Sequence, residues 1–134
     1  MRVLAGGVGV VAIVLVGWGL RVGTVEAQDD AAKPEFYTTR VLPILKANCY
    51  KCHSGPTPKG GLSLETKAGM LKGGMDGSVL VPGDPKKSLI VRLIRHEGPA
   101  EDPMPMPKGG AKLSDADIAV IEQWVKAGAA VPAE

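Results

Sequence analysis

The residues with the clearest chemical meaning are Cys49-Tyr50-Lys51-Cys52-His53. Two thiols three positions apart, followed directly by an imidazole, form the attachment pattern of a c-type haem. One helical turn brings both thiols to the vinyl groups on one porphyrin edge, and the next residue supplies a nitrogen ligand to the iron. The chain has only these two cysteines, so no other thiol competes for either role.

Two other roles are open to the same thiols: a dithiol or disulfide with an incidental histidine, or half of a zinc site. Zinc takes four ligands, and His53 follows Cys52 directly, which suits no standard zinc-finger spacing. A thioredoxin-type redox pair needs a βαβ pattern around it, and the sequence has none. We therefore expect one covalent haem c on Cys49 and Cys52, with His53 as the proximal iron ligand.

The second face of such an iron needs either a ligand or an open site. The candidate ligands are Met70, Met75, His96, Met104 and Met106. A thioether opposite histidine favours ferrous iron and suits a proline-stiffened loop, such as Pro103-Met104-Pro105-Met106-Pro107. Met70 fits a core position on a helix, and His96 fits a solvent-facing position after a helix. The loop methionines are therefore the favoured distal ligands.

The N-terminus has the pattern of an export signal. Arg2 precedes an uncharged apolar run over 3–20, and Val25-Glu26-Ala27 is close to a small-x-small cleavage site. We predict a signal peptide over 1–27, with a retained membrane anchor through residues 3–20 as the alternative. Both place the functional domain in the periplasm or otherwise outside the cytoplasm, where c-type haem is attached.

Cleavage after Ala27 leaves 107 of the 134 residues, enough for one small domain. Its net charge is +1, because removal of Arg2, Arg21 and Glu26 leaves 14 basic and 13 acidic residues. The absence of a basic stripe excludes a typical nucleic-acid-binding surface. We expect a monomer whose partners are redox proteins.

Helical spacing predicts an all-α domain with long Gly/Pro loops. After a flexible tether over 28–34, a helix over 35–47 is expected to kink or restart at Pro43. Further helices are predicted over 66–71, over 86–95 with an Asp84 cap, and from a Ser114 cap to Gly128. The 96–112 stretch is long for a small domain and is typical of a functional loop.

The haem motif, a proline-flanked methionine some fifty residues on and a closing amphipathic helix with Trp124 resemble class I mono-haem cytochrome c. Three phrases, YTTRVLPILKANCYKCH, VPGDPKKSLIVRLI and MPKGGAKLSDADIAVIEQWVKAGA, are similar to the small secreted c-type cytochrome domain of planctomycetes and related bacteria. The resemblance covers about 35–130. It implies a cytochrome c-like fold of three to five helices around one haem.

The resemblance also implies a distal ligand. In that family the axial methionine opens a Met-Pro pair shortly before the last helix, which favours Met106 over Met104. Lys108 stands where the family has a second proline, and the extra Met104-Pro105 pair keeps Met104 as the alternative. The family further implies that the first and last helices cross, with Phe36 or Tyr37 and Val41 against Ile121 and Trp124.

These features predict a non-enzymatic carrier that transfers single electrons through a His/Met-ligated haem c. We place Lys51, Lys59 and Lys108 near the exposed haem edge, where they either guide an acidic partner or are only solvated surface. The alternatives are a haem relay subunit of a membrane or dehydrogenase complex, and a small haem peroxidase or sensor with a displaceable distal ligand.

Overall fold

The computed structural model describes residues 29–133, and the predicted signal peptide or anchor over 1–27 lies outside that range. Within the described part no helix is long and apolar enough to cross a membrane. Part of the segment predicted as a tether is structured, because residues 29–31 are helical and the Ala31 side chain is fully buried.

The first helical run is continuous but changes its geometry before Pro43. It passes through α2 (Pro34–Phe36), the π-helical segment η1 (Tyr37–Val41) and α3 (Leu42–Asn48). Pro43 cannot donate to the carbonyl four residues earlier, and its ring would collide with it. The wider turn, in which the Leu42 N–H donates to the Tyr37 carbonyl, accommodates the proline, and the predicted restart lies there.

The last helix, α7 (Asp115–Lys126), has the predicted ends. The Ser114 hydroxyl accepts from the Asp117 N–H at 3.1 Å. Gly128 has φ +103°, and the N–H groups of Gly128 and Ala129 donate to the carbonyls of Val125 and Trp124. This pair of bonds is a Schellman motif, which ends the helix without leaving those carbonyls unsatisfied.

The first and last helical elements pack together as predicted. The ring centroids of Tyr37 on η1 and Trp124 on α7 lie 5.5 Å apart. Trp124 is fully buried and its indole N–H donates to the Ala130 carbonyl at 2.7 Å. This crossing anchors the core, whose fully buried side chains include Val41, Leu45, Met70, Leu80, Ile121, Trp124 and Val125.

The helix predicted over 86–95 is shorter than expected: α6 spans Leu89–Ile94. Asp84 does accept from the Lys87 N–H at 3.1 Å, but this closes a turn and not the first turn of the helix. The fully buried Ser88 hydroxyl accepts from the Val81 N–H and donates to the Asp84 carbonyl, each at 2.9 Å. These bonds hold Ser88 in an extended conformation, so α6 begins after it.

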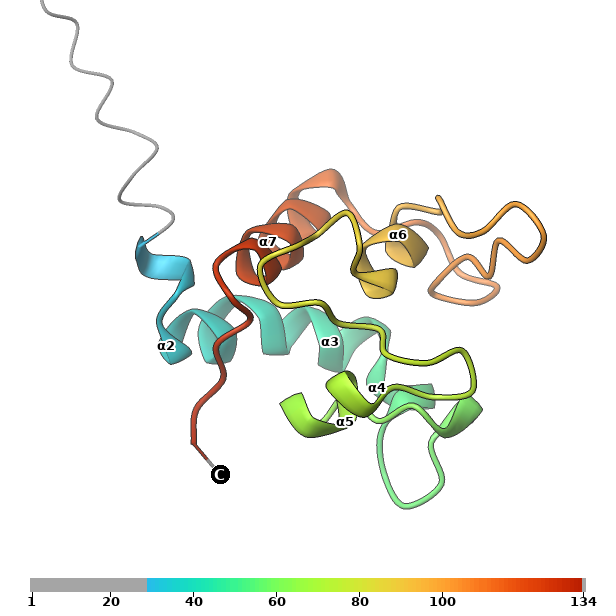
Figure 1. Cartoon of the computed structure of the whole chain (residues 1–134), viewed down its shortest axis with the longest axis horizontal. Helices are drawn as coiled ribbons and strands as arrows, with labels where there is room; N and C mark the ends of the chain where they lie inside the picture. The colour runs from blue at the N-terminus through green and yellow to red at the C-terminus, as the bar shows by residue number, and fades with distance from the viewer. Residues whose placement is uncertain (1–28, 134) are drawn as a thin grey trace, which may run out of the picture.

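The remaining elements are short. They are α4 (Tyr50–His53), the 3-10 turn η2 (Lys59–Gly61) and α5 (Lys67–Lys72), which Thr66 caps. The described residues form no strand, only one isolated bridge between Gly74 and Gly77, so this part of the chain is all-α as predicted. In Figure 1, α5 lies below α3, and α4 lies toward the same end of the molecule as α6 and the loop that follows it.

Candidate haem-binding site

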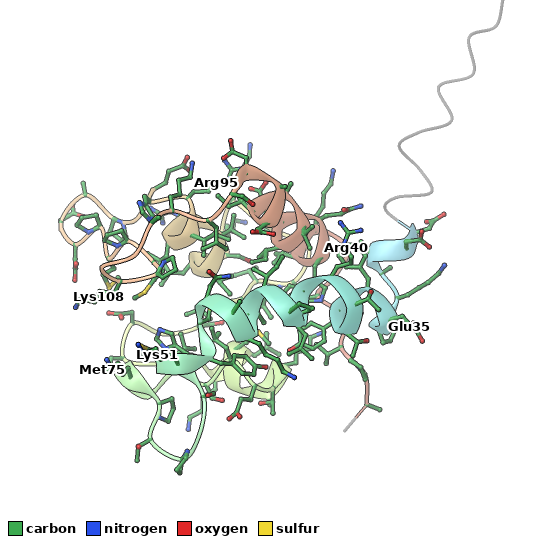
Figure 2. The ribbon with its side chains drawn as sticks, turned by 180° about the vertical axis from the view of Figure 1, so that it is seen from behind. Glu35, Arg40, Lys51, Met75, Arg95 and Lys108 are labelled. Carbon is green, nitrogen blue, oxygen red and sulfur yellow. The ribbon has the colours of Figure 1, made fainter. Side chains whose placement is uncertain are left out.

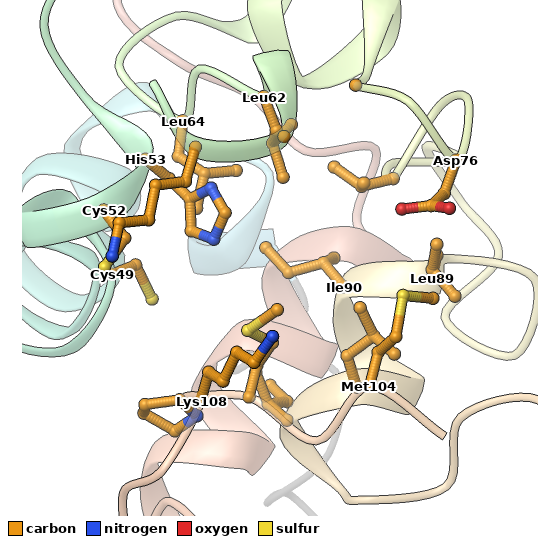
Figure 3. A pocket seen from close by; sticks show the side chains of 18 of the residues that line it. Cys49, Cys52, His53, Leu62, Leu64, Asp76, Leu89, Ile90, Met104 and Lys108 are labelled. Atoms are coloured by element: carbon orange, nitrogen blue, oxygen red, sulfur yellow. The ribbon is translucent and has the colours of Figure 1, made fainter. Parts of the chain in front are cut away.

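A cavity of about 570 Å³ opens between these segments (Figure 3). This volume lies in the range of small-molecule and cofactor sites. Its walls come from α4, the turns around Gly60 and Gly74, α6 and the proline-rich loop. The aliphatic lining residues are Leu62, Leu64, Val79, Leu89, Ile90, Leu93 and Ile94.

The motif predicted to attach haem lines one wall of this cavity. The His53 and Cys52 N–H groups donate to the Cys49 carbonyl at 2.9 and 3.0 Å, which makes one compact turn. Both cysteines are free thiols, and Figure 3 shows them beside the His53 ring at the cavity wall. The His53 carbonyl accepts from the Leu64 N–H at 2.8 Å, so α4 is fastened to the next wall segment.

Burial affects two polar groups of this wall, the Cys49 thiol and the His53 imidazole. Burial, and next the nearby Cys52, raises the pKa of the Cys49 thiol to about 11, so the thiol is protonated at neutral pH. The His53 Nδ1 atom is buried and has no hydrogen-bond partner among the described residues. An imidazole so placed is unusual for a core residue, because buried polar atoms are nearly always paired.

Both loop methionines reach the cavity. Met104 and Met106 are half-buried and line it. The Met106 N–H donates to the Leu93 carbonyl at 3.1 Å, which ties this residue to the end of α6. Met104 has a strained left-handed backbone with φ +38°, and in Figure 3 it lies beside Leu89, across the cavity from Cys49.

The other candidates for the distal ligand differ in whether they line the cavity. Met70 is fully buried in the core and does not line the cavity. His96 is exposed, lies outside the cavity and has φ +60°. Met75 lines the cavity mouth, but its side chain is 88 % exposed. Position therefore keeps Met104 and Met106 as the two half-buried methionines that line the cavity.

The charged side chains of the cavity wall are few. Lys51, Lys59 and Lys108 line it, together with the carboxylate of Asp76. Arg95 lies elsewhere and pairs with Glu122 on α7 through bonds of 2.7 and 2.8 Å, which raise its pKa. Arg92 donates to the Glu97 carbonyl at 3.3 Å, also outside the cavity.

Part of the wall was not predicted from the sequence. Leu62, Leu64 and Val79 were not placed in the site, because loop residues without periodicity give no sign of the face they present. Residues 74–77, which also line the cavity, were not singled out either. The cluster of glycines was the available signal, since close backbone approach often requires glycine.

The residues present fit a haem c. Two free thiols and an imidazole with an unpartnered buried nitrogen share one wall, aliphatic side chains cover the interior, and two thioethers approach from another segment. The zinc alternative has no counterpart in the described residues, where no group of three or more His, Cys, Asp or Glu side chains could hold a metal ion.

Comparison with known proteins adds one finding. The model of a protein family described as Planctomycete cytochrome C matches residues 49–119, more than half of the chain. The matched segment begins at the first cysteine of the motif and ends within α7, so it contains every residue that lines the cavity except Asn48. No curated protein and no solved structure matches the chain.

Proposed function

Since the chain belongs to the planctomycete cytochrome c family, we propose that it is an electron carrier that transfers single electrons between redox proteins through one covalent haem c. The observation that supports this most is the shared cavity of Cys49, Cys52, His53 and the loop methionines. The family itself supports a c-type cytochrome with haem c. The role as an electron carrier and the identity of the iron ligands go beyond the family and are part of the proposal.

In this proposal the Cys49 and Cys52 thiols bind the haem vinyl groups, and the His53 imidazole is the proximal ligand. The distal ligand is Met106, with Met104 as the alternative. Bound haem supplies an iron that alternates between ferric and ferrous states, and histidine with methionine raises its reduction potential. All these side chains line the same cavity, which is the arrangement such ligation requires.

The chain's own contribution is to bind, orient and exclude water. The turn from Cys49 to His53 presents thiols and imidazole from one rigid segment, since three backbone bonds fix it. The backbone bond between Met106 and Leu93 limits movement of the loop, so little rearrangement is expected between redox states. The aliphatic side chains on α6 keep the interior dry, which favours rapid electron transfer over ligand exchange.

We further propose a cytochrome c-like fold over 35–130 and export through residues 1–27. The contact between Tyr37 and Trp124 supports the fold, because it packs the first helical run against the last helix. A membrane-attached relay subunit would use the same haem site. It would differ from a free carrier because it would keep residues 3–20 as a membrane anchor.

The peroxidase alternative has less support. It needs an open distal site with an acid-base residue. His96 is exposed outside the cavity, and the neighbouring Arg95 is held by Glu122. A sensor would need a distal ligand that carbon monoxide displaces readily.

Haem staining after denaturing electrophoresis tests the proposal directly. We expect a stained band from the exported fraction, and its loss in the double variant Cys49→Ala/Cys52→Ala. His53→Ala is the matched control, because it keeps both thiols and removes only the iron ligand. An unstained wild-type band at full yield would overturn covalent haem attachment.

A further inference from the structure

We propose that the fold leaves the His53 imidazole without a hydrogen-bond acceptor, so that His53 binds the iron as a weakly basic ligand and raises the reduction potential of the haem. The inference rests on the proposed function, because it concerns the ligand that His53 supplies to a haem in this cavity. It assigns to the surroundings of His53 a share in setting the potential of the carrier.

The Nδ1 atom of His53 is exceptional in this structure. It is the one buried side-chain nitrogen or oxygen without a hydrogen-bond partner in the described part of the chain. Figure 3 shows the ring at the cavity wall with one nitrogen directed into the cavity. A neutral imidazole has one lone-pair nitrogen for a metal and one N–H group. If Nε2 takes the iron, the buried Nδ1 carries the N–H group and has no acceptor.

The backbone carbonyls of the next wall segment are bonded to other groups. The Pro58 carbonyl accepts from the Gly61 N–H at 3.0 Å, which closes η2. The Gly60 carbonyl accepts from the Met75 N–H at 2.9 Å, which fastens η2 to the glycine turn that carries Met75. These carbonyls hold the wall together, and none of them accepts from the His53 Nδ1 atom.

The polar side chains closest to His53 in the sequence bond to the backbone of the preceding turn. The Ser54 hydroxyl donates to the Tyr50 carbonyl at 2.6 Å. The Asn48 amide donates to the Ile44 carbonyl at 2.9 Å. Side chains of this type often bond to local backbone carbonyls in this way. Neither of them accepts from the imidazole.

The carboxylates, which are the strongest acceptors, are engaged elsewhere or distant. Glu65 accepts from a backbone N–H in the loop after the motif at 3.0 Å. Asp76 is the one carboxylate that lines the cavity, and Figure 3 shows it across the cavity from His53. In Figure 2, Glu35 lies at the end of the molecule opposite Lys51, which belongs to the haem motif.

Aliphatic side chains lie beside the imidazole instead. Figure 3 shows Leu62 and Leu64 next to the His53 ring. Leu64 is buried, with 3 % of its surface exposed, and its N–H donates to the His53 carbonyl at 2.8 Å. Leu62 is half-buried and lines the cavity. A hydrocarbon cannot accept a hydrogen bond, so these leucines bury Nδ1 without pairing it.

The missing acceptor has a chemical consequence. A histidine that ligates a metal almost always donates its other N–H to an acceptor, which raises the basicity of the ligand. A basic ligand stabilises ferric iron more than ferrous iron. His53 lacks this support, so its effect on the potential has the same sign as that of a methionine ligand. The electron acceptor of this carrier must then be a one-electron oxidant of still higher potential.

Resonance Raman spectroscopy tests the state of the Nδ1–H group directly. The probe is the ferrous carbon monoxide complex of Met104→Ala/Met106→Ala, which photodissociation leaves with His53 as the ligand. Its iron–histidine stretching frequency is compared with that of ferrous haem and 2-methylimidazole in toluene, without and with dimethylformamide as acceptor. We expect the frequency of the unpaired reference. The frequency of the hydrogen-bonded reference would show that a water or a carbonyl pairs with Nδ1, and would overturn the proposal.

Added acceptors test the effect on the potential. Leu62→Asn and Leu64→Asn each place an amide oxygen on the wall beside the ring, and Leu62→Ile is the control of equal volume. An asparagine that pairs with Nδ1 should raise the stretching frequency in the double-methionine variant. In the protein with both methionines it should stabilise the ferric state about tenfold, a fall of about 59 mV for one electron.

The control and the haem stain separate the outcomes. Leu62→Ile should leave both the frequency and the potential unchanged. A raised frequency without a fall in potential, or no rise in either asparagine variant, would overturn the proposal. Haem staining of each variant reports separately on covalent attachment, and so on the proposed function, while circular dichroism shows whether the buried Leu64→Asn substitution keeps the fold.

Discussion

The ring of Tyr37 lies against the indole of Trp124, with 5.5 Å between centroids and 37° between planes. This contact joins the π-helical turn before Pro43 to the last helix. Burial, and next a hydrogen bond with Tyr50, raises the pKa of Tyr37, so its phenol stays neutral at every physiological pH. The pair packs the N- and C-terminal elements against each other in the core.

Replacement of Trp124 tests that relationship. Trp124→Ala should lower the free energy of unfolding of the holoprotein by about 3–5 kcal/mol, because it empties a fully buried site and removes the bond to the Ala130 carbonyl. Urea unfolding followed by circular dichroism measures this loss. The control Lys126→Ala, on the exposed side of α7, should change little. An equal loss in both variants would contradict the role of the crossing.

Single substitutions of the two loop methionines should affect the spectrum of the holoprotein differently. In Met106→Ala we expect loss of the long-wavelength sulfur-to-iron charge-transfer band of the oxidised protein and a lower reduction potential. Met104→Ala should keep the band, because its backbone lacks the bond that holds Met106 to Leu93. Met75→Ala is the control for a methionine at the cavity mouth. The opposite pattern would assign the ligand to Met104.

The loop itself is positioned by Gly98. A Cβ at this residue would collide with the Pro103 carbonyl, next to Met104. Gly98→Ala should therefore displace the loop and weaken the charge-transfer band, with a smaller shift of the same sign in potential as Met106→Ala.

The same loop offers a matched control for that substitution. A Cβ at Gly110 would meet only Pro107, with 3.4 Å to its Cβ atom and 3.6 Å to its carbonyl oxygen, and Gly110 has no positive φ. Gly110→Ala should therefore keep the spectrum. Unchanged spectra in both variants would show that Gly98 does not position the methionines.

The burial of Cys49 predicts a pH dependence in the haem-free chain. In Cys52→Ala, which leaves Cys49 as the single thiol, alkylation by iodoacetamide should still show a midpoint above the ordinary thiol pKa under native conditions, because burial is the larger cause of the raised pKa. In urea the midpoint should return to the ordinary value of about 8.5. A raised thiol pKa stabilises the folded state below the ordinary pKa, and this contribution is lost as pH rises toward 11. An ordinary native midpoint would mean that the thiol is solvated.

Much of the helical fold follows from local signals. Ser114 and Gly128 bound the last helix as predicted, because a cap and a C-terminal glycine act through their own hydrogen bonds and backbone angles. The predicted start of α6 was wrong by three residues, because a hydrogen bond between residues far apart in the sequence determines where this helix begins. Ser88 is held by Val81, seven residues earlier, and no helix periodicity reveals such a bond.

The site was predictable where its chemistry is local. The motif from Cys49 to His53 holds two thiols and an imidazole together within five residues, so the sequence alone identifies this part of the cavity wall. The aliphatic wall and the Met75 turn depend on how separate loops meet, as in the bond from Met75 to Gly60, and sequence spacing does not encode that contact. The sequence left Met104 as an alternative because the Met-Pro pair is doubled, and the bond from the Met106 N–H to the Leu93 carbonyl adds one observation in favour of Met106.

The visible spectrum of the purified holoprotein, oxidised and then reduced by titration with one-electron equivalents, tests the central claim most directly. The account predicts a low-spin, six-coordinate haem c in both states, converted completely by one electron per chain. A high-spin spectrum that changes on addition of peroxide or carbon monoxide would contradict the carrier function and favour an enzyme or a sensor.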